Sequence, residues 1–253
     1  MSPRKTPFVP GEYYHLYNRG NSNQVIFRDE YDYIHFIKLL YLSNTRYRIV
    51  LRDLVNEFNV ARLGQRVVYI GAYSLMPDHF DLIIAVPENG NISKFMQRLL
   101  TAYSMYFNAK YSHSGSLFEG KFKSKYISSN RYLRYLFSYV LLNPLKLIYD
   151  SWPERRIEDK GEAVEFLSKY EYSCFCGLVD PKRKENKVID RGRFPDYFYK
   201  SNTIKNDIFE WARYDVKGIG AKKQNKKKAK RKKKVSAINY EAMGMEQIWI
   251  DCV

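Results

Sequence analysis

Cysteine is scarce in this sequence: three occur among 253 residues, at Cys174, Cys176 and Cys252. Three clustered cysteines cannot form the disulfide framework of a small secreted protein, so we expect a reducing compartment, the cytoplasm. Cys174 and Cys176 have the spacing of half a metal site, but no second cysteine pair follows them. We therefore interpret both as packing residues.

Long hydrophobic runs are also missing. No run approaches the roughly 20 apolar residues of a membrane span, so we expect no membrane-spanning helix and no membrane partner. Residues 1–20 contain Pro3, Pro7 and Pro10 and no apolar core, so they are not a signal peptide. Hydrophobic residues nevertheless make up 45% of the chain, enough for a sizeable globular core.

Acidic residues are few relative to basic ones, and the net charge is +16. Residues 222–234 hold ten Lys or Arg and no acid, so removing them leaves +6 on the rest of the chain. Such a block is typical of an arm that binds polyanions, although a solubilising tail has the same composition. The 23 tyrosines and 15 phenylalanines, interleaved with cations, suit single-stranded nucleic acid, but core packing also uses many such rings.

Hydrophobic periodicity predicts the order strand, helix, strand, strand, helix, strand, helix. The predicted strands cover 12–19, 67–74, 79–86 and 121–127, and the predicted helices cover 29–43, 91–111 and 130–142. This order is that of an α+β, ferredoxin-like βαββαβ core with a central antiparallel sheet, followed by one more helix. Two further short helices are expected near 50–58 and 203–214. A fold of this kind does not by itself indicate a function.

The composition divides the chain into five parts. We expect an N-terminal lead-in (residues 1–10), a folded core domain (11–150) and a C-terminal extension (151–216). A basic disordered tail (217–235) and a last segment of undefined role (236–253) follow.

The stretch MPDHFDLII, residues 76–84, carries polar residues at the start of an apolar run. If a strand begins at His79, then His79 and Asp81 point to the same face and Phe80 points to the core. A histidine and a carboxylate on one face can share a divalent cation. His-x-Asp also occurs at ordinary solvated strand ends, and the pair alone favours that interpretation.

The predicted helix 130–142 carries a second polar pattern. Tyr135, Tyr139 and Asn143 follow at four-residue intervals and therefore lie along one side of the helix. The alternative is structural: a tyrosine at the edge of the core and an asparagine that caps the helix before Pro144.

Together, MPDHFDLIIAV and YLRYLFSYVLLNPLK resemble the single-tyrosine HUH transposases, and most of all the REP-associated tyrosine transposases with their IS200-like domain. The segments YHLYNRGNSNQVIF, ISKFMQRLLTAYSMYFNAKY and GSLFEGKFKSKYI support the resemblance in the same order along the chain. It covers roughly residues 10–150.

The resemblance implies a DNA transposase or nickase that cleaves and rejoins single-stranded or hairpin DNA. By analogy, Tyr139 is the nucleophile that forms a 5′-phosphotyrosine link, and Mg²⁺ or Mn²⁺ is held by His79, Asp81 and Asn143. Phosphate contacts are expected from basic residues of two strands: Arg19, Lys121, Lys123 and Lys125.

Asp81 departs from the family pattern, which has a second histidine there. Aspartate still binds a hard cation, but it is shorter than histidine. The site is therefore either an active variant or that of an impaired or domesticated DNA- or RNA-binding protein on the same fold. A ribosome- or RNA-associated factor would explain the charge but not the set of His79, Tyr139 and Asn143. The sequence leaves a monomer and a homodimer equally open.

Overall fold

The computed structural model describes residues 7–46, 58, 64–149, 152, 157, 159–196, 199 and 208–210. The predicted helix at 50–58, except its last residue, lies outside the described residues. So do the basic tail, residues 217–235, and the last segment, residues 236–253. Of the predicted helix at 203–214, only residues 208–210 are described, and they are helical.

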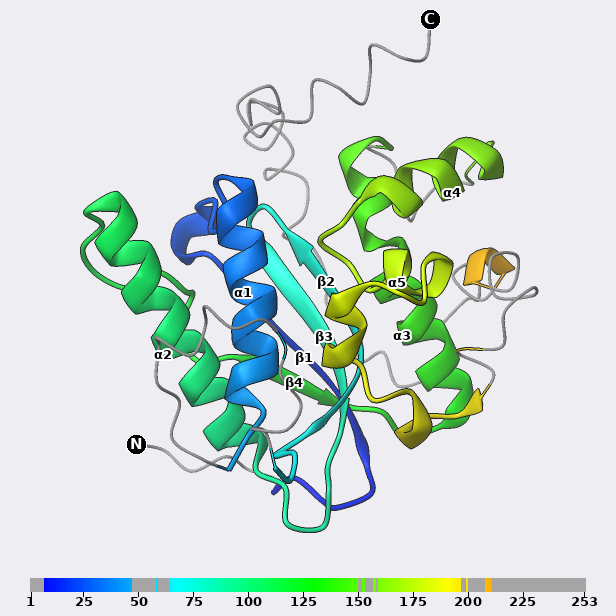
Figure 1. Ribbon diagram of the computed structural model, residues 1–253, viewed down its shortest axis with the longest axis horizontal. Helices are drawn as coiled ribbons and strands as arrows, with labels where there is room; N and C mark the ends of the chain where they lie inside the picture. The colour runs from blue at the N-terminus through cyan, green and yellow to red at the C-terminus, as the bar shows by residue number, and fades with distance from the viewer. Residues whose placement is uncertain are drawn as a thin grey trace, which may run out of the picture.

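A four-stranded sheet forms the centre of the protein (Figure 1). Its strands are β1 (Tyr13–Arg19), β2 (Tyr69–Met76), β3 (His79–Ala85) and β4 (Lys123–Tyr126). They lie in the order β2-β3-β1-β4, and every neighbouring pair is antiparallel. The α+β class and the antiparallel sheet expected from the sequence are confirmed, although β4 is shorter than the predicted 121–127.

Three helices cover the sheet. Helices α1 (Glu30–Ser43) and α2 (Ile92–Tyr111) lie side by side on one face, and α3 (Asn130–Leu142) packs against β2 and β3 on the other (Figure 1). Each helix begins where a side chain accepts a hydrogen bond from a backbone N–H three residues on. These N-caps are Asp29, Asn91 and Ser129.

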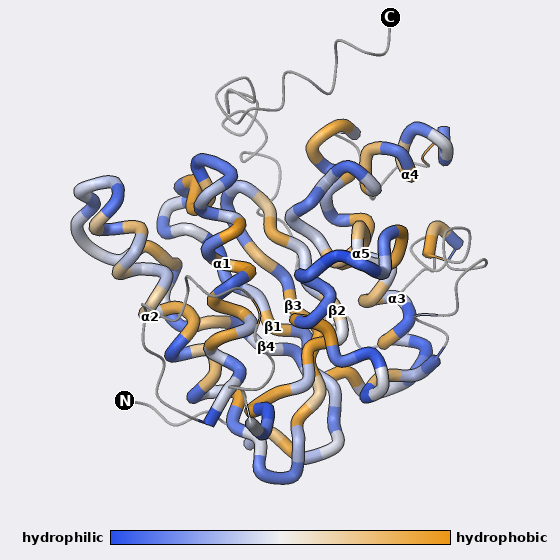
Figure 2. The backbone as a smooth tube through the Cα atoms, in the orientation of Figure 1, coloured by the Kyte–Doolittle hydropathy of each residue, from blue (hydrophilic) through white to orange (hydrophobic). Residues whose placement is uncertain are grey.

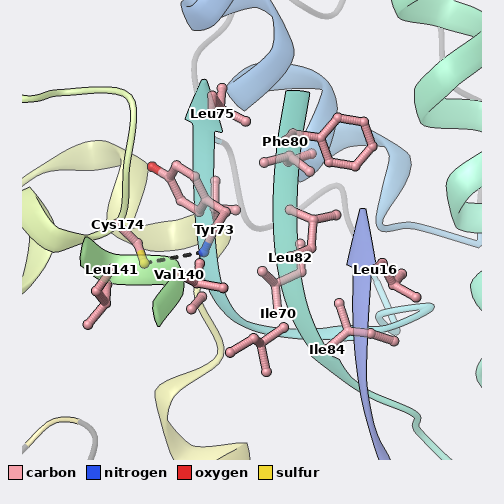
Figure 3. Packing of buried hydrophobic residues seen from close by; sticks show 14 of the residues in the cluster. Leu16, Ile70, Tyr73, Leu75, Phe80, Leu82, Ile84, Val140, Leu141 and Cys174 are labelled. Atoms are coloured by element: carbon pink, nitrogen blue, oxygen red, sulfur yellow. Dashed lines mark hydrogen bonds between the residues drawn. The ribbon is translucent and has the colours of Figure 1, made fainter. Parts of the chain in front are cut away.

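The main core fills the space between the sheet and the α1–α2 pair. Leu16, Phe80 and Leu82 are fully buried there, and Figure 3 shows them on adjacent strands with Ile84. Strands β2 and β3 are accordingly hydrophobic along much of their length, whereas β4, with the sequence KSKY, is hydrophilic (Figure 2). Because side chains alternate along a strand, the residues between these core positions face α3 instead.

The C-terminal extension covers the free edge of β2. It contains α4 (Lys160–Lys169) and α5 (Phe175–Val179), followed by the short 3-10 turns η5 (Lys184–Val188) and η6 (Arg191–Arg193). The backbone N–H groups of Leu75 and Cys174 donate to Tyr172 O and Tyr73 O at 3.0 and 3.1 Å. Pairing of this kind leaves less of the strand edge available to another chain.

The two described cysteines, Cys174 and Cys176, are buried in this extension. Cys174 Sγ accepts a hydrogen bond from Tyr73 N at 3.3 Å, close to Val140 and Leu141 of α3 (Figure 3). Burial raises the pKa of the Cys174 thiol to about 12, so it stays protonated and unreactive at neutral pH. None of the helices in the described ranges is long and apolar enough to cross a membrane.

A buried carboxylate joins α1 to the end of α2. Asp32 is fully buried and accepts hydrogen bonds from Lys110 Nζ at 2.8 Å and from the hydroxyls of Tyr106 and Tyr111 at 3.0 and 2.9 Å. Arg28 N donates to the same carboxylate at 2.7 Å. Its removal would leave several donors without their buried acceptor.

Asp32→Ala is expected to lower the free energy of unfolding by about 3 kcal/mol, because it leaves Lys110 beside an apolar site without its buried partner. Urea denaturation monitored by circular dichroism measures the change. Asp29→Ala is the matched control: this more exposed carboxylate also binds Lys110, and loss of the N-cap costs about 1 kcal/mol. A loss at Asp32 no larger than the loss at Asp29 would contradict the structural role of the buried network.

Candidate active site

The start of β3 presents polar side chains to the face of the sheet on which α3 packs. His79 is the first residue of β3 and is paired with Arg19 of β1, while Asp81 is paired with Tyr17. Phe80 points the opposite way, into the main core. The sequence pattern predicted this alternation, and the structure has it.

Asn143 brings α3 and β3 together. It follows the last residue of α3 and begins the 3-10 turn η4 (Asn143–Leu147). Its Nδ2 donates to Asp81 Oδ2 at 2.9 Å and lies 3.3 Å from His79 Nε2. His79 Nε2 and Asp81 Oδ2 are 3.6 Å apart. Three residues that the resemblance grouped as metal ligands therefore lie in one cluster.

His15 of β1 is a fourth member of the cluster, and no pattern in the sequence predicted it. Its Nε2 lies 2.7 Å from Asp81 Oδ1, and both side chains are buried. Because a carboxylate only accepts, His15 Nε2 carries the proton. No local sequence signal marks this contact, which depends on the antiparallel pairing of β1 with β3.

Asp78 orients His79 from the other side. Asp78 Oδ1 lies 2.6 Å from His79 Nδ1, so Nδ1 carries the proton and Nε2 keeps its lone pair toward the cluster. Burial pushes the pKa of Asp78 upward, but the hydrogen bond from His79 and the electrostatic attraction of its imidazole outweigh burial, and the pKa lies below its usual value. Asp78 is therefore an anion at neutral pH.

Asp81 is also held as an anion. Burial raises the pKa of its carboxyl, yet the hydrogen bond with His15 and the electrostatic attraction of His15, His79 and Lys146 outweigh burial and leave the pKa below its usual value. A buried carboxylate in this state is a strong ligand for a cation.

The donor atoms fit a hard divalent cation. His79 Nε2 and Asp81 Oδ2 both face the Asn143 amide N–H, so the position between their lone pairs suits a positive group. Asn143 Oδ1 is buried with no hydrogen-bond partner in the described part of the chain, and rotation of the amide would turn this oxygen to the same position. Within the described ranges, no three His, Cys, Asp or Glu side chains meet as ligands, so the fit depends on the Asn143 amide. One imidazole and two oxygens suit Mg²⁺ or Mn²⁺.

Tyr139 lies one helical turn before Asn143 on α3 and is half-buried. Lys146 Nζ donates to the Tyr139 hydroxyl at 2.7 Å and lies 4.7 Å from the centre of its ring. The same ammonium also lowers the pKa of Asp81, so its field reaches both the tyrosine and the cluster. Lys146 was not predicted, although the spacing of 139, 143 and 146 places all three on one side of a helix.

The four residues expected to contact phosphates differ in their partners and positions. Arg19 and Lys123 both pair with Glu119, at 3.3 and 3.5 Å. Lys123 and Lys125 are paired with Tyr17 and His15, which places them on the same face as the cluster. Lys121 is exposed and lies just before β4.

Comparison with known proteins gives a match to a family model and matches to solved structures. Residues 33–141 match the family model described as "Transposase IS200 like". This range includes His79, Asp81 and Tyr139, and it ends before Asn143 and Lys146. No curated protein matches the chain significantly.

A solved structure of a REP-associated tyrosine transposase bound to a REP hairpin is similar to this chain, at 16% sequence identity and a TM-score of 0.45. The match covers 81% of this chain and 93% of that one. The family model, in contrast, matches the amino-acid sequence. The matched range contains His79, Asp81 and Tyr139, three of the four residues expected to form the active site. Residues 33–141 are thus similar in sequence to the IS200-like transposase family.

Proposed function

We propose that this protein is a metal-dependent transposase or nickase that cleaves and rejoins single-stranded, hairpin-flanked DNA through a 5′-phosphotyrosine intermediate. One observation carries the proposal: Asn143, one turn after Tyr139, hydrogen-bonds Asp81 and lies 3.3 Å from His79 Nε2. A nucleophile on α3 and a ligand set on β3 are thereby joined in one site.

His79, Asp81 and Asn143 would hold the cation, Mg²⁺ or Mn²⁺. When bound, such an ion polarises a phosphate and neutralises charge that builds up as the phosphodiester is attacked. The chain itself supplies the orientation: Asp78 holds His79 through Nδ1, and His15 holds Asp81 through Oδ1. Both ligands are therefore preorganised by hydrogen bonds from outside the ligand set.

Tyr139 is the proposed nucleophile. A tyrosine hydroxyl is a weak nucleophile near neutral pH, and a nearby positive charge favours its ionised form. Lys146 supplies that charge at 2.7 Å and also holds the hydroxyl in one orientation. Attack on phosphorus would form the tyrosyl phosphodiester and release the 3′-hydroxyl of the preceding nucleotide. Because one phosphodiester replaces another, the strand can be rejoined by the reverse reaction.

Lys146→Met is expected to slow formation of the covalent adduct about a hundredfold, because it removes the charge and the hydrogen bond at the Tyr139 hydroxyl. Lys146→Arg keeps the charge and should retain more of the rate. The rate constant comes from single-turnover trapping on denaturing gels with saturating protein. Equal rates for Lys146→Met and the unchanged protein would remove Lys146 from the mechanism.

The proposed function also suggests a role for each of the other parts of the chain. We infer that residues 11–150 carry the chemistry, that residues 151–216 support the β2 edge, and that the basic segment 217–235 adds affinity for DNA. Arg19, Lys121, Lys123 and Lys125 would contact phosphates beside the site. One or two copies of the chain would act on each DNA end.

A second candidate is a DNA-binding protein on the same fold that does not cut. It is favoured by one observation: both oxygens of Asp81 are already hydrogen-bonded, to His15 and Asn143. Covalent trapping on hairpin oligonucleotides with Mn²⁺ separates the two functions. A metal-dependent protein–DNA band supports the transposase, and binding without any such band supports the second candidate.

A further inference from the structure

Residues 120–149 form a continuous stretch without acidic residues, bracketed by Glu119 and Asp150. Within it lie six basic residues: Lys121, Lys123, Lys125, Arg131, Arg134 and Lys146. The stretch contains β4, α3 and η4, and therefore the edge strand beside the cluster and the helix that carries Tyr139. Five of these six residues lie on β4, α3 and η4, which the fold places next to the candidate active site.

Tyrosine rings form a row along α3. The rings of Tyr132 and Tyr135 have centres 6.3 Å apart and planes 14° apart, and those of Tyr135 and Tyr139 have centres 6.2 Å apart and planes 25° apart. Tyr132 is buried, whereas Tyr135 and Tyr139 are half-buried and keep part of their surface accessible. The near-parallel rings present successive aromatic surfaces along one side of the helix.

A cation lies at each end of the tyrosine row. Lys125 Nζ lies 4.8 Å from the centre of the Tyr132 ring, and Lys146 Nζ lies 4.7 Å from that of Tyr139. With 1.5 Å rise per residue, Tyr132 and Asn143 are about 16 Å apart along the axis. The row therefore runs from the exposed side chain of Lys125 on β4 to the cluster at Asn143.

We propose that this surface, defined by Lys125, Tyr135, Tyr139 and Lys146, binds unpaired nucleotides of the DNA strand and leads them to the active site. Bases stack on the accessible part of Tyr135, and the lysines contact the flanking phosphates. This proposal rests on the proposed function in one respect, namely that the bound strand runs toward Tyr139 as the nucleophile.

Single-stranded rather than duplex DNA fits this surface. Stacking on a tyrosine requires a base whose face is free, and in a duplex those faces are covered by neighbouring base pairs. The cations alone would serve either form, because phosphates carry the same charge in both. The aromatic row is therefore the feature that selects the unpaired strand.

The test measures affinity for a fluorescent unpaired oligonucleotide by anisotropy, on the full chain in EDTA so that no cleavage occurs. Tyr135→Leu is expected to weaken binding about five- to a hundredfold, and Tyr135→Phe to leave it within about twofold, because phenylalanine keeps the stacking ring. Lys125→Gln should lower the slope of log affinity against log salt by about 0.7, the value for one phosphate on a single strand. All variants keep the segment 222–234, so its contribution cancels.

Tyr126→Leu is the matched control. Tyr126 is 49% exposed on the same strand as Lys125, but it is paired with Tyr14 and so lies on the opposite face of the sheet. Its substitution should not change affinity. A blunt duplex of the same sequence should bind equally to Tyr135→Leu and to the unchanged protein.

Two results would overturn the inference: unchanged single-strand affinity in Tyr135→Leu, or an equal loss for duplex and single strand. If Tyr135→Leu does not fold, photocrosslinking of iodouracil oligonucleotides to the unchanged protein replaces it, with a crosslink at Tyr135 expected and crosslinks confined to other elements contradicting the proposal. The binding test needs no metal, whereas covalent trapping does. A failure of covalent trapping would therefore reject the proposed catalysis without affecting the result of the binding test.

Discussion

Tyr139→Phe is expected to abolish the covalent protein–DNA adduct completely, while affinity for the same oligonucleotide changes less than about twofold. Phenylalanine keeps the ring that packs along α3 and loses only the hydroxyl that accepts from Lys146 at 2.7 Å. The hydroxyl oxygen is the atom that would become bonded to phosphorus, so no residual route through residue 139 remains. The measurement is a denaturing gel of labelled hairpin oligonucleotides incubated with protein and Mn²⁺.

The matched control is Tyr31→Phe, a hydroxyl deletion at a tyrosine that is 66% exposed on α1, on the other side of the sheet. It should leave the adduct unchanged. An adduct that persists in Tyr139→Phe would assign the nucleophile to another residue, and the absence of any adduct in the unchanged protein would favour the DNA-binding function without cleavage.

Asp81→Ala is expected to weaken Mn²⁺ binding at least about a hundredfold, because it removes a ligand oxygen together with the one negative charge in the ligand set. Isothermal titration calorimetry measures this without DNA or turnover. The substitution also leaves His15 and Asn143 without a buried acceptor, so thermal unfolding should be recorded for each variant.

Two graded variants separate ligation from positioning. Asp78→Asn and His15→Gln keep the ligand atoms of His79 and Asp81 and disturb only the hydrogen bonds that orient them, so each should weaken Mn²⁺ binding by roughly 10- to 100-fold. Equal Mn²⁺ affinity in Asp81→Ala and the unchanged protein would show that Asp81 is not a ligand and that its role is the hydrogen bond to His15. Asp81→His then tests whether the histidine that the resemblance implies at this position restores adduct formation.

The aspartate at position 81, where the resemblance implies a second histidine, has a structural counterpart. A histidine at 81 would be larger than aspartate in a position that is only 5% exposed, and it would stand where His15 now donates at 2.7 Å. The pair of His15 and Asp81 therefore keeps one imidazole and one carboxylate together in the buried layer between the sheet and α3.

Local patterns were sufficient for much of this architecture. Alternation in MPDHFDLII placed His79 and Asp81 on one face, because a strand repeats every two residues whatever its neighbours are. Four-residue spacing likewise placed Tyr139 and Asn143 on one side of α3, and Pro144 ended that helix as expected. The predicted order of strands and helices in the core is the observed one.

The sequence by itself therefore determined the class of the fold and the two polar stretches, since both depend on residues close together in the chain. Only the tertiary structure decided that His15 would meet Asp81, that Lys146 would hold the Tyr139 hydroxyl beyond the end of a helix, and that residues 170–194 would cover β2. The contact of His15 with Asp81 and those of residues 170–194 with β2 join segments far apart in the chain, where no periodic pattern signals a contact. The contact of Lys146 with Tyr139 crosses the change from α-helical to 3-10 geometry at Asn143. They arise from sheet register and packing, which the whole chain determines together.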